Sequence, residues 1–319
     1  MPDKPATRTT PAEIRLAHSP DSDDMVMWWP LTGQRSPGGE PVPGPLGQPA
    51  IDTGRFRFTL AAADVEDLNQ RATKGDEGVD VTAISAASYP GCRDRWVITR
   101  TGGSFGEGYG PRVVVRSDSS IASAEQLAGC TIAVPGLGTT AFLTLSLLLG
   151  SSEHAPAFEP VPMRFDAVQQ AVLGGDADAG LLIHEAQLTH EDAGLRKVVD
   201  LGAWWGMETG QPLPLGLNVA RADLDERFGA GTLVALSGVL HASVRHALDN
   251  PSDSRAYLRL HQGDRTEWSD TDLVDRYLSM YVSELTLDMG EIGIAALQSL
   301  YHRGAEAGLI ERPPSVMVV

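Results

Sequence analysis

Short apolar runs and longer helical segments alternate through the middle of the chain. Runs that predict buried strands occupy residues 132–134, 161–164 and 179–183. The segments between them, residues 141–149 and 167–173, predict helices. Strands that alternate with helices in this way are typical of βαβ units in a largely parallel sheet. We therefore expect a compact α/β lobe in this region.

The N-terminal part predicts a second group of strands. These strands are expected at residues 13–17, 56–61 and 79–85. One helix is expected to begin near Met25 and another after Asp64, which is a candidate N-cap. Residues 31–52 contain several Pro and Gly and few apolar residues, so they predict a surface insertion.

The C-terminal part is mostly helical. Apolar residues recur there at helical spacing over residues 233–248, 271–281 and 290–307. We expect these helices to cover a discontinuous first lobe made of residues 1–112 and 220–319, with residues 113–219 as the second α/β lobe. Strands crossing between the lobes near residues 113–115 and 217–219 would form the hinge. This order is that of a two-lobed, type II periplasmic-binding-protein-like α/β fold, with the ligand in an interlobe cleft.

Composition narrows the range of partners. The 42 Asp and Glu residues outnumber the 25 Lys and Arg residues, and the net charge of -17 opposes binding to nucleic acid or to an anionic membrane. The longest apolar stretch, residues 141–149, is too short to span a membrane. Residues 1–15 lack the apolar core of a secretory signal, so we expect a cytoplasmic protein. Cys92 and Cys130 are too few and too separated for a disulfide framework or a zinc site.

His184 is the leading candidate for chemistry. It ends the apolar run 180–183, and in an open α/β sheet ligands bind beyond the carboxyl ends of the strands. A histidine at a strand end is often only hydrogen-bonded, and this structural role stays open on local pattern alone. Glu185 is expected to point to the other side of an extended strand, so we assign it a structural role.

Hydroxyl and carboxyl groups near other strand ends are candidates for ligand binding. Thr139 and Thr140 precede a strong helix, where two hydroxyls and free amides suit a carboxylate or oxyanion; simple N-capping is the alternative. Ser85 ends a strand of the first lobe, although the local pattern by itself somewhat favours a turn-initiating serine. Ser19 and Asp24 lie in the loop after the first strand, where either can cap the next helix, and Asp24 can instead orient a substrate hydroxyl.

Several other chemistries find little support. The glycine-rich residues 104–111 lack the Gly-Lys-Ser/Thr ending of a phosphate-binding loop. The other histidines show no metal-ligand spacing, and no Gly-x-Ser-x-Gly elbow is present, so neither a metal site nor a common hydrolase is expected. The pairs Trp28-Trp29 and Trp204-Trp205 suit stacking on a flat ligand, but core packing is the commoner use of tryptophan.

Taken together, these segments resemble the 1,4-dihydroxy-6-naphthoate synthases of the futalosine route to menaquinone. The resemblance runs over most of the chain and depends on the order and spacing of motifs that are individually weak. These motifs are residues 80–85 (DVTAIS), 106–111 (GEGYGP), 132–136 (IAVPG), 139–141 (TTA), 178–185 (DAGLLIHE), 200–205 (DLGAWW), 209–216 (TGQPLPLG), 280–283 (MYVS) and 286–290 (TLDMG).

The resemblance implies an enzyme that cleaves carbon-carbon bonds of cyclic dehypoxanthinyl futalosine, a small-molecule carboxylate, releasing a sugar-derived fragment and 1,4-dihydroxy-6-naphthoate. It implies that His184 accepts a proton and that Ala83, Ile84, Ser85, Thr139 and Thr140 hold the substrate. It also implies that no cofactor is needed, because aromatisation drives the reaction. A neutral imidazole near pH 7 is suited to this task.

The chain also departs from the family pattern. Many members have Ser-Pro-Cys-Pro-Asn-Asp where residues 19–24 read Ser-Pro-Asp-Ser-Asp-Asp, so that acids replace a thiol and an amide. A frequent Lys-Val is replaced by Ala83-Ile84. Two other functions stay open at this point. They are a non-catalytic cytoplasmic binding protein of the same fold, since fold alone does not fix function, and the related chorismate dehydratase.

Overall fold

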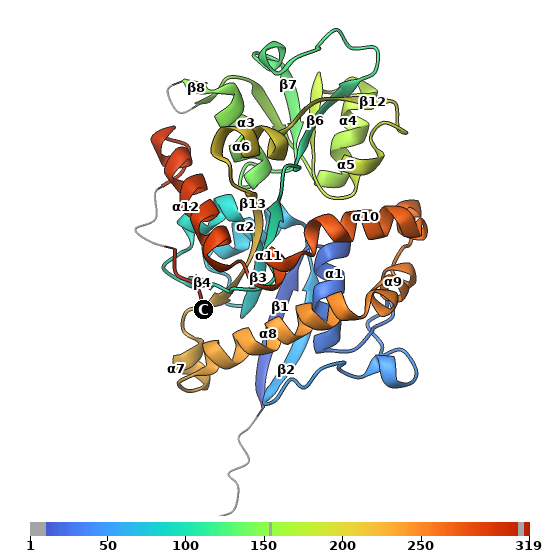
Figure 1. The fold of residues 1–319 in the computed structure, drawn as a ribbon, viewed down its shortest axis with the longest axis vertical. Helices are drawn as coiled ribbons and strands as arrows, with labels where there is room; N and C mark the ends of the chain where they lie inside the picture. The colour runs from blue at the N-terminus through green and yellow to red at the C-terminus, as the bar shows by residue number, and fades with distance from the viewer. Residues whose placement is uncertain (1–10, 153–154, 312–315) are drawn as a thin grey trace, which may run out of the picture.

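Two β-sheets, one in each lobe, organise the chain (Figure 1). The structure is a computed structural model that describes residues 11–152, 155–311 and 316–319. Both ends of the chain contribute to the lower lobe in Figure 1, drawn in blue and in orange to red. The middle of the chain, drawn in green and yellow, forms the upper lobe. Most of residues 1–15, where we expect no secretory signal, lie outside the described residues.

The first sheet has the strand order β2-β1-β3-β13-β4, and β5 also pairs with β13. Its strands are β1 Ala12–His18, β2 Phe56–Ala62, β3 Val81–Ser85, β4 Trp96–Ile98, β5 Ser104–Gly106 and β13 Leu213–Arg221. The pairs of β1 with β2 and β3 are parallel, whereas β13 runs antiparallel to β3. The carboxyl ends of β1 and β3 therefore meet at one edge of the sheet, which is where ligands bind in open α/β folds.

The second sheet has the strand order β10-β7-β11-β6-β12. Its strands are β6 Arg112–Arg116, β7 Thr131–Val134, β10 Glu159–Pro162, β11 Ala179–Leu182 and β12 Leu195–Asp200. The three strands β10, β7 and β11 are parallel, as expected of βαβ units, and β6 pairs antiparallel with β11. A short hairpin of β8 Ser151–Ser152 and β9 Ala155–Pro156 lies apart from this sheet.

Helices cover both sheets (Figure 1). They are α1 Ser22–Trp28, α2 Val65–Lys74, α3 Thr140–Leu149, α4 Val168–Gly174, α5 Ala186–Thr189, α6 Leu201–Thr209, α7 Leu224–Phe228, α8 Thr232–Asp249, α9 Pro251–Leu260, α10 Thr271–Tyr281, α11 Glu284–Leu287 and α12 Gly290–Glu306. Asp64 caps α2 by accepting a hydrogen bond from Glu66 N, as predicted. No described helix is both long and apolar enough to cross a membrane.

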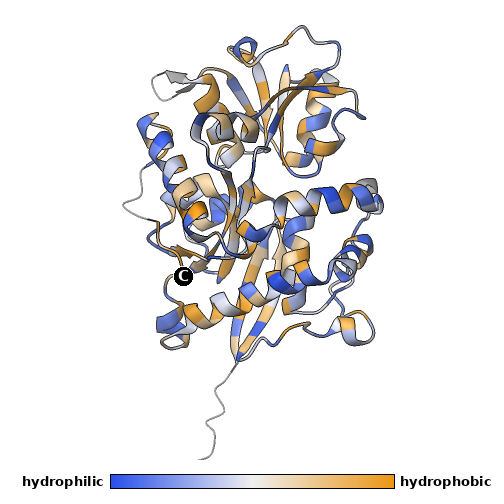
Figure 2. Ribbon diagram, in the orientation of Figure 1, coloured by the Kyte–Doolittle hydropathy of each residue, from blue (hydrophilic) through white to orange (hydrophobic). Residues whose placement is uncertain are grey.

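The central strands β3 and β11 are buried along their whole length, which explains why they read as apolar runs, whereas the edge strand β2 is partly exposed. In the first lobe, Ile14 and Leu16 of β1 pack in one core with α1 and α8, while Ala17 belongs to the core on the other face. In the second lobe, Val113 and Val114 of β6 likewise belong to cores on opposite faces. Figure 2 shows the consequence, with hydrophobic strands inside and hydrophilic stripes on the outer helices.

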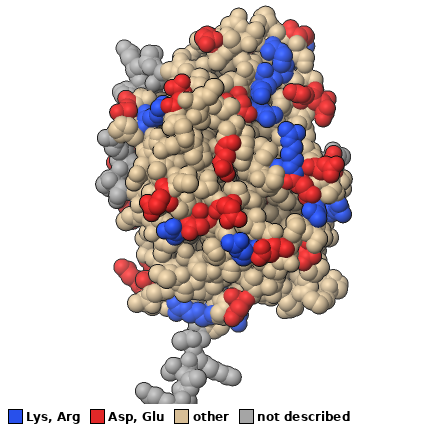
Figure 3. Space-filling view, in the orientation of Figure 1, with Lys and Arg blue, Asp and Glu red and all other residues tan. Residues whose placement is uncertain are grey.

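Figure 3 shows the charged side chains on one face of the molecule. On the face drawn in Figure 3, Lys and Arg side chains lie in small groups beside Asp and Glu. The insertion at residues 31–52 begins at the end of the 3-10 turn Trp29–Leu31 and contains a second short 3-10 turn, Pro45–Gly47, and an isolated bridge between Arg35 and Pro41. The glycine-rich residues 104–111 differ from a simple loop, because β5 forms there against β13.

The connections between the lobes differ from the predicted hinge. Strand β6 lies wholly in the second sheet, and β13 lies wholly in the first, so neither strand crosses between lobes. The crossings instead occupy residues 107–111, between β5 and β6, and residues 210–212, between α6 and β13. The expected boundary at residue 219 falls inside β13, whose apolar sequence does not reveal which sheet it joins. We propose that the lobes divide at these two connections.

Candidate active site

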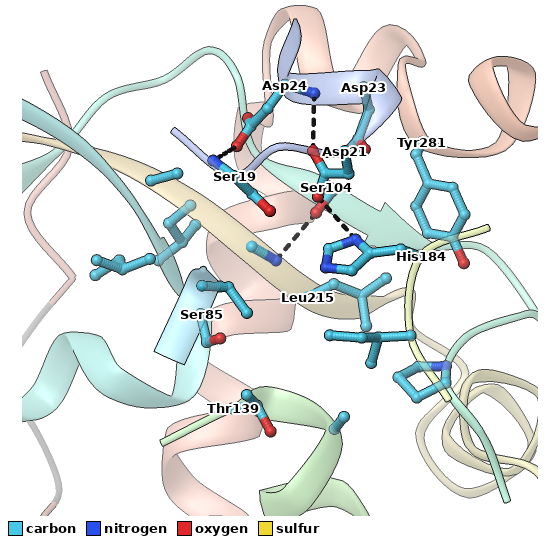
Figure 4. A pocket seen from close by; sticks show the side chains of 18 of the residues that line it. Ser19, Asp21, Asp23, Asp24, Ser85, Ser104, Thr139, His184, Leu215 and Tyr281 are labelled. Atoms are coloured by element: carbon cyan, nitrogen blue, oxygen red, sulfur yellow. Dashed lines mark hydrogen bonds and ion pairs between the residues drawn. The ribbon is translucent and has the colours of Figure 1, made fainter. Parts of the chain in front are cut away.

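His184 lies in a turn between β11 and α5, where the two lobes face each other (Figure 4). The strand ends at Leu182, two residues before the histidine, so the expected extended strand is too long. His184 has φ 55°, and it is the one non-glycine residue with a positive φ in the part of the chain that the structure describes. A side chain with a Cβ rarely adopts this conformation, and such strained positions cluster at functional sites.

The imidazole of His184 is held on one side and free on the other. Its Nδ1 lies 2.7 Å from Oδ2 of Asp21, and the two side chains are 14% and 5% exposed. The ring of Phe165 packs edge-on against it at 4.7 Å between centroids. Its Nε2 is buried without a hydrogen-bond partner among the described residues, and Figure 4 shows this ring edge facing the cavity. A buried imidazole nitrogen that no protein group satisfies is suited to meet a ligand.

A cavity of about 100 Å³ lies between the lobes next to His184. It is lined by residues of the first sheet and α1, by the start of α3, by the turn around His184 and by two tyrosines of α10 (Figure 4). Strand β13 runs beside β3, with Gly216 opposite Ser85 and Asn218 opposite Ala83, so both strands contribute to the lining. The volume of the cavity is below the range of about 300–1,000 Å³ that is usual for ligand pockets.

The structure brings most of the expected residues together. Those that line the cavity with His184 are Ser19, Asp24, Ala83, Ile84, Ser85 and Thr139. Thr140 is different, because its Oγ1 donates to Leu215 O at 2.8 Å and accepts from Ala87 N at 3.0 Å. The hydroxyl of Thr140 therefore joins α3 to the first lobe, and it does not line the cavity.

The local roles of Ser85 and Thr139 coexist with their place in the cavity. Thr139 caps α3, since its Oγ1 accepts from Phe142 N at 3.1 Å and donates to Gly136 O at 2.9 Å. Asn69 holds Ser85 by accepting from its backbone N at 2.7 Å and donating to its Oγ at 3.1 Å. Capping thus leaves the amides of the first turn of α3 as the donors that an anionic ligand can use.

Glu66 already uses one donor of the loop before α3. Its Oε2 accepts from Gly138 N at 3.1 Å, and Ser88 Oγ donates to Gly138 O at 2.8 Å. Both side chains belong to the first lobe, whereas the loop belongs to the second. A Cβ on Gly136 would lie 2.6 Å from the Glu66 carboxylate, so a side chain there would prevent this close approach. The loop is therefore a contact between lobes as well as a wall of the cavity.

Three carboxyl groups lie together at the start of α1. The N-cap of the helix is Asp21, which accepts from Asp24 N at 3.3 Å, so neither Ser19 nor Asp24 caps it as expected. Asp24 Oδ2 accepts from Ser19 N at 2.7 Å. Asp23 Oδ1 accepts from the hydroxyl of Tyr277 at 3.2 Å. The Ser19 hydroxyl is buried without a partner among the described residues, and it lines the cavity.

Burial and mutual repulsion separate the pKa values of these carboxyls. Burial, together with the charge of Asp21, raises the pKa of Asp24 to about 8 and holds the pKa of Asp23 well above its usual range. Burial also acts against the Asp21 anion, but the charge and hydrogen bond of His184 outweigh it and lower the pKa of Asp21 to about 2. Asp21 is therefore the ionised member of the group near pH 7.

His184 shows the matching effect. Burial alone would lower the pKa of its imidazole, but the Asp21 carboxylate, with smaller effects from Glu185 and Asp24, raises it above the usual value. The ion pair thus stabilises a protonated His184. Near neutral pH, an imidazole of this kind can both accept a proton and keep the resulting charge.

Sequence reasoning missed several residues of this site. Asp21 and Asp23 stood in a loop that looked altered, and nothing in the sequence paired either with a histidine in the other lobe. Tyr277 and Tyr281 of α10 line the cavity. The sequence predicted this helix but did not show which of its faces would meet the cavity. One ligand atom each from Asp21, Asp23 and His184 lies within 4.8 Å of the others, which is the spacing of a candidate metal site that no sequence spacing indicated.

Glu185 connects the lobes beside the cavity. Its Oε1 accepts from Ser22 N at 3.1 Å, from Ser22 Oγ at 2.6 Å and from Trp268 Nε1 at 3.0 Å.

Trp28, Trp29 and Trp205 are buried in the cores of the molecule, as the packing interpretation of the tryptophan pairs expects. Of the two cysteines, Cys92 is buried and Cys130 is partly exposed, and both are free.

Comparison with known proteins agrees with this architecture. A family model described as menaquinone biosynthesis matches residues 14–306. The chain belongs to this family. Membership places it among enzymes of menaquinone biosynthesis, and it agrees with the resemblance drawn from the sequence motifs.

Individual members of the menaquinone biosynthesis family align over nearly the whole chain. A 1,4-dihydroxy-6-naphthoate synthase of Thermus thermophilus is 37% identical over 96% of this chain and 99% of its own length. The protein of that name from Streptomyces coelicolor is 36% identical over 93% of this chain and 94% of its own length. A crystal structure of an Archaeoglobus fulgidus protein is 37% identical, with a TM-score of 0.75 over 93% of this chain and 98% of its own.

More distant structures confirm the predicted fold. The alkanesulfonate-binding protein SsuA of Xanthomonas axonopodis pv. citri, bound to MOPS, has a TM-score of 0.65 at 15% identity and covers 97% of this chain and 98% of its own. The menaquinone biosynthesis protein thus has the periplasmic-binding-protein-like fold, with the cavity between its lobes.

Proposed function

We propose that this protein is a 1,4-dihydroxy-6-naphthoate synthase that acts in the cytoplasm as a carbon-carbon lyase. Its substrate would be cyclic dehypoxanthinyl futalosine, and its products 1,4-dihydroxy-6-naphthoate and dihydroxyacetone. Family membership and the two relatives of that name support the reaction. The observation that carries the proposal is the buried Nε2 of His184, which has no partner among the described residues and borders the interlobe cavity.

His184 would act as the base. Its Nε2 takes a proton from the substrate, and the Asp21 carboxylate at Nδ1 balances the charge that the ring acquires. The substrate carboxylate or a developing oxyanion would meet the amides of the first turn of α3 and the polar groups of Ser85 and Thr139. No cofactor is required, because formation of an aromatic ring supplies the driving force.

Closure of the lobes would complete the site. The cavity of about 100 Å³ is smaller than usual ligand pockets, so the lobes must part for the substrate to enter. When they close, groups from β3 and α1 on one side meet His184 and α3 on the other. Closure would also exclude water from the carbanion-like intermediate that follows proton removal.

The test is turnover of cyclic dehypoxanthinyl futalosine by the purified protein and its His184→Ala variant. We expect the wild-type protein to form 1,4-dihydroxy-6-naphthoate, measured by absorbance and mass, and the variant to lose at least about 100-fold in kcat. The variant should keep the wild-type circular dichroism spectrum, because the imidazole contributes one interlobe contact among several.

Three outcomes would contradict the proposal in different ways. Tight binding of the substrate without product would favour a binding protein. Dehydration of chorismate without turnover of the cyclic substrate would favour the sister enzyme. Full turnover by the His184→Ala variant would remove His184 from the reaction while leaving the reaction itself in place.

A further inference from the structure

The N-cap of α1 contacts the candidate base from the opposite lobe. Asp21 has an extended backbone (φ −83°, ψ 169°), and its Oδ1 accepts from Asp24 N at 3.3 Å. Its second oxygen, Oδ2, lies 2.7 Å from Nδ1 of His184. One carboxylate therefore has two contacts with different purposes. The helix fixes the direction of the side chain, and the free oxygen points at the imidazole (Figure 4).

The hydrogen bond at Nδ1 decides which nitrogen of His184 can accept a proton. An ionised carboxylate can only accept, so Nδ1 must carry the hydrogen. In the neutral ring, the lone pair then lies on Nε2, which is the nitrogen that borders the cavity. With the opposite tautomer, the nitrogen facing the cavity would carry a hydrogen and could not accept another.

The other titratable groups around His184 have different partners. Asp23 accepts from the Tyr277 hydroxyl, and Asp24 accepts from Ser19 N. Glu185 accepts from Ser22 and from Trp268. On α10, the Tyr281 hydroxyl donates to Gln187 Oε1 at 2.9 Å. Asp21 is thus the group among these that is within hydrogen-bonding distance of the imidazole.

We propose that Asp21 is a positioning residue, which holds His184 across the cleft with Nε2 toward the substrate, so that the base is assembled only when the lobes close. This inference rests on the proposed function. In the reaction, the proton leaves the substrate for Nε2, its bonding electrons stay on the substrate, and Asp21 remains an anion beside the imidazolium. When the lobes part, Asp21 leaves with α1, and His184 loses the contact that orients it.

The test compares Asp21→Asn with the wild-type protein in steady-state turnover of cyclic dehypoxanthinyl futalosine. Asparagine is also a good N-cap, so α1 should keep its start. The neutral amide no longer fixes the Nδ1–H tautomer, and we expect kcat to fall by about 100- to 10,000-fold, as for similar His–Asp pairs. KM should change by less than about threefold, because Asp21 acts on the base.

A pH profile separates positioning from simple structural damage. Loss of a carboxylate beside an imidazole lowers the pKa of the imidazole. The acidic limb of kcat should therefore move to lower pH in Asp21→Asn. The matched control is Glu306→Gln, which removes the carboxylate from an exposed pair with a distance of 2.8 Å between His302 Nε2 and Glu306 Oε1. That variant should keep both kcat and the profile.

A measurement on the wild-type protein tests the tautomer of His184 directly. In nitrogen-15 spectra of labelled histidine, with the His184 signal assigned by its loss in His184→Gln, the neutral ring should show the Nδ1–H tautomer. An Nε2–H tautomer would overturn the proposal. So would wild-type kcat and pH profile in a folded Asp21→Asn variant, provided that the wild-type protein turns over its substrate. If the wild-type protein forms no product, the proposed function fails, and the tautomer still tests the positioning.

A divalent cation is the competing use of the same group, since one ligand atom each from Asp21, Asp23 and His184 lies within 4.8 Å of the others. We expect chelation with EDTA to leave kcat unchanged, because positioning needs a proton at Nδ1. A loss of turnover on chelation that Mn²⁺ or Zn²⁺ restores would replace positioning by cation binding.

Discussion

Asp24 is a buried carboxyl group whose ionisation is disfavoured in the folded protein. Burial and the nearby Asp21 charge raise its pKa to about 8, whereas the unfolded chain ionises it near its ordinary value. A raised carboxyl pKa means that the folded state binds a proton that the unfolded state has released. The group therefore lowers stability as pH rises from about 4 toward 8, and its effect is absent below the unfolded pKa.

Asp24→Asn should accordingly stabilise the protein in a pH-dependent manner. Asparagine keeps a carbonyl oxygen for Ser19 N and removes the need for protonation, although it weakens the 3.4 Å contact with Trp28 Nε1. We expect a gain of up to about 5 kcal/mol at pH 8, since the pKa in the folded protein lies about four units above the ordinary value and each unit corresponds to about 1.4 kcal/mol. Denaturant unfolding at pH 8 and pH 4 checks this, and an equal effect at both values would contradict the assigned protonation.

Single residues show where sequence reasoning stops. The sequence could point to His184 because an apolar run stops there, and the cavity does border this residue. It could not reveal Asp21 as the partner, because the pairing depends on how two lobes close. The contact of Thr140 could not be predicted from the sequence either, because it also depends on how the two lobes pack. Its position at the start of a helix suited ligand binding, but a carbonyl of β13 lies close enough to take its hydrogen bond.

At the level of elements, periodicity identified most strands and helices but not their partners. The helix predicted at residues 271–281 is α10 Thr271–Tyr281, and the strand predicted at residues 56–61 is β2 Phe56–Ala62. The predicted hinge strands were placed in the wrong role because β6 and β13 are equally apolar. Only their ladders show that one pairs with β11 and the other with β3.

The contact between α3 and the first lobe should matter for stability. Thr140→Val would leave Leu215 O and Ala87 N without the hydroxyl that now bonds both at 2.8 and 3.0 Å. Two partly buried groups would lose a partner, and we expect a loss of about 1–3 kcal/mol in the free energy of unfolding. Thr140→Ser keeps the hydroxyl and serves as the control. Equal unfolding midpoints for the two variants would show that the hydroxyl does not join the lobes.

At the scale of the molecule, polar side-chain contacts join the two lobes around the cavity, while Leu143 of α3 and Trp205 of α6 pack in the apolar core of the first lobe. Glu66 and Ser88 hold the loop before α3, Glu185 holds Ser22 and Trp268, and Asp21 holds His184. Polar contacts of this kind exchange readily for water, whereas breaking apolar contacts exposes hydrophobic surface. The same contacts that close the cavity are therefore suited to opening it for the substrate.

Glu185→Ala should shift the molecule toward the open state. The change removes the acceptor of three hydrogen bonds between the lobes and leaves the cavity lining intact. Small-angle scattering should show a radius of gyration above that of the wild-type protein, which is about 20 Å for a compact chain of this length. The substrate or product should close the variant again and return the radius toward the wild-type value.

A control variant must remove the same charge without removing these contacts between the lobes. Glu191 lies in the same lobe with a side chain that is 80% exposed, so Glu191→Ala removes the same charge and should leave the radius unchanged. KM should rise in Glu185→Ala, because part of the binding energy is then spent on closure, while kcat at saturation should stay within about threefold. Identical scattering from both variants would mean that Glu185 does not control the equilibrium, and that the remaining interlobe contacts suffice to keep the site closed.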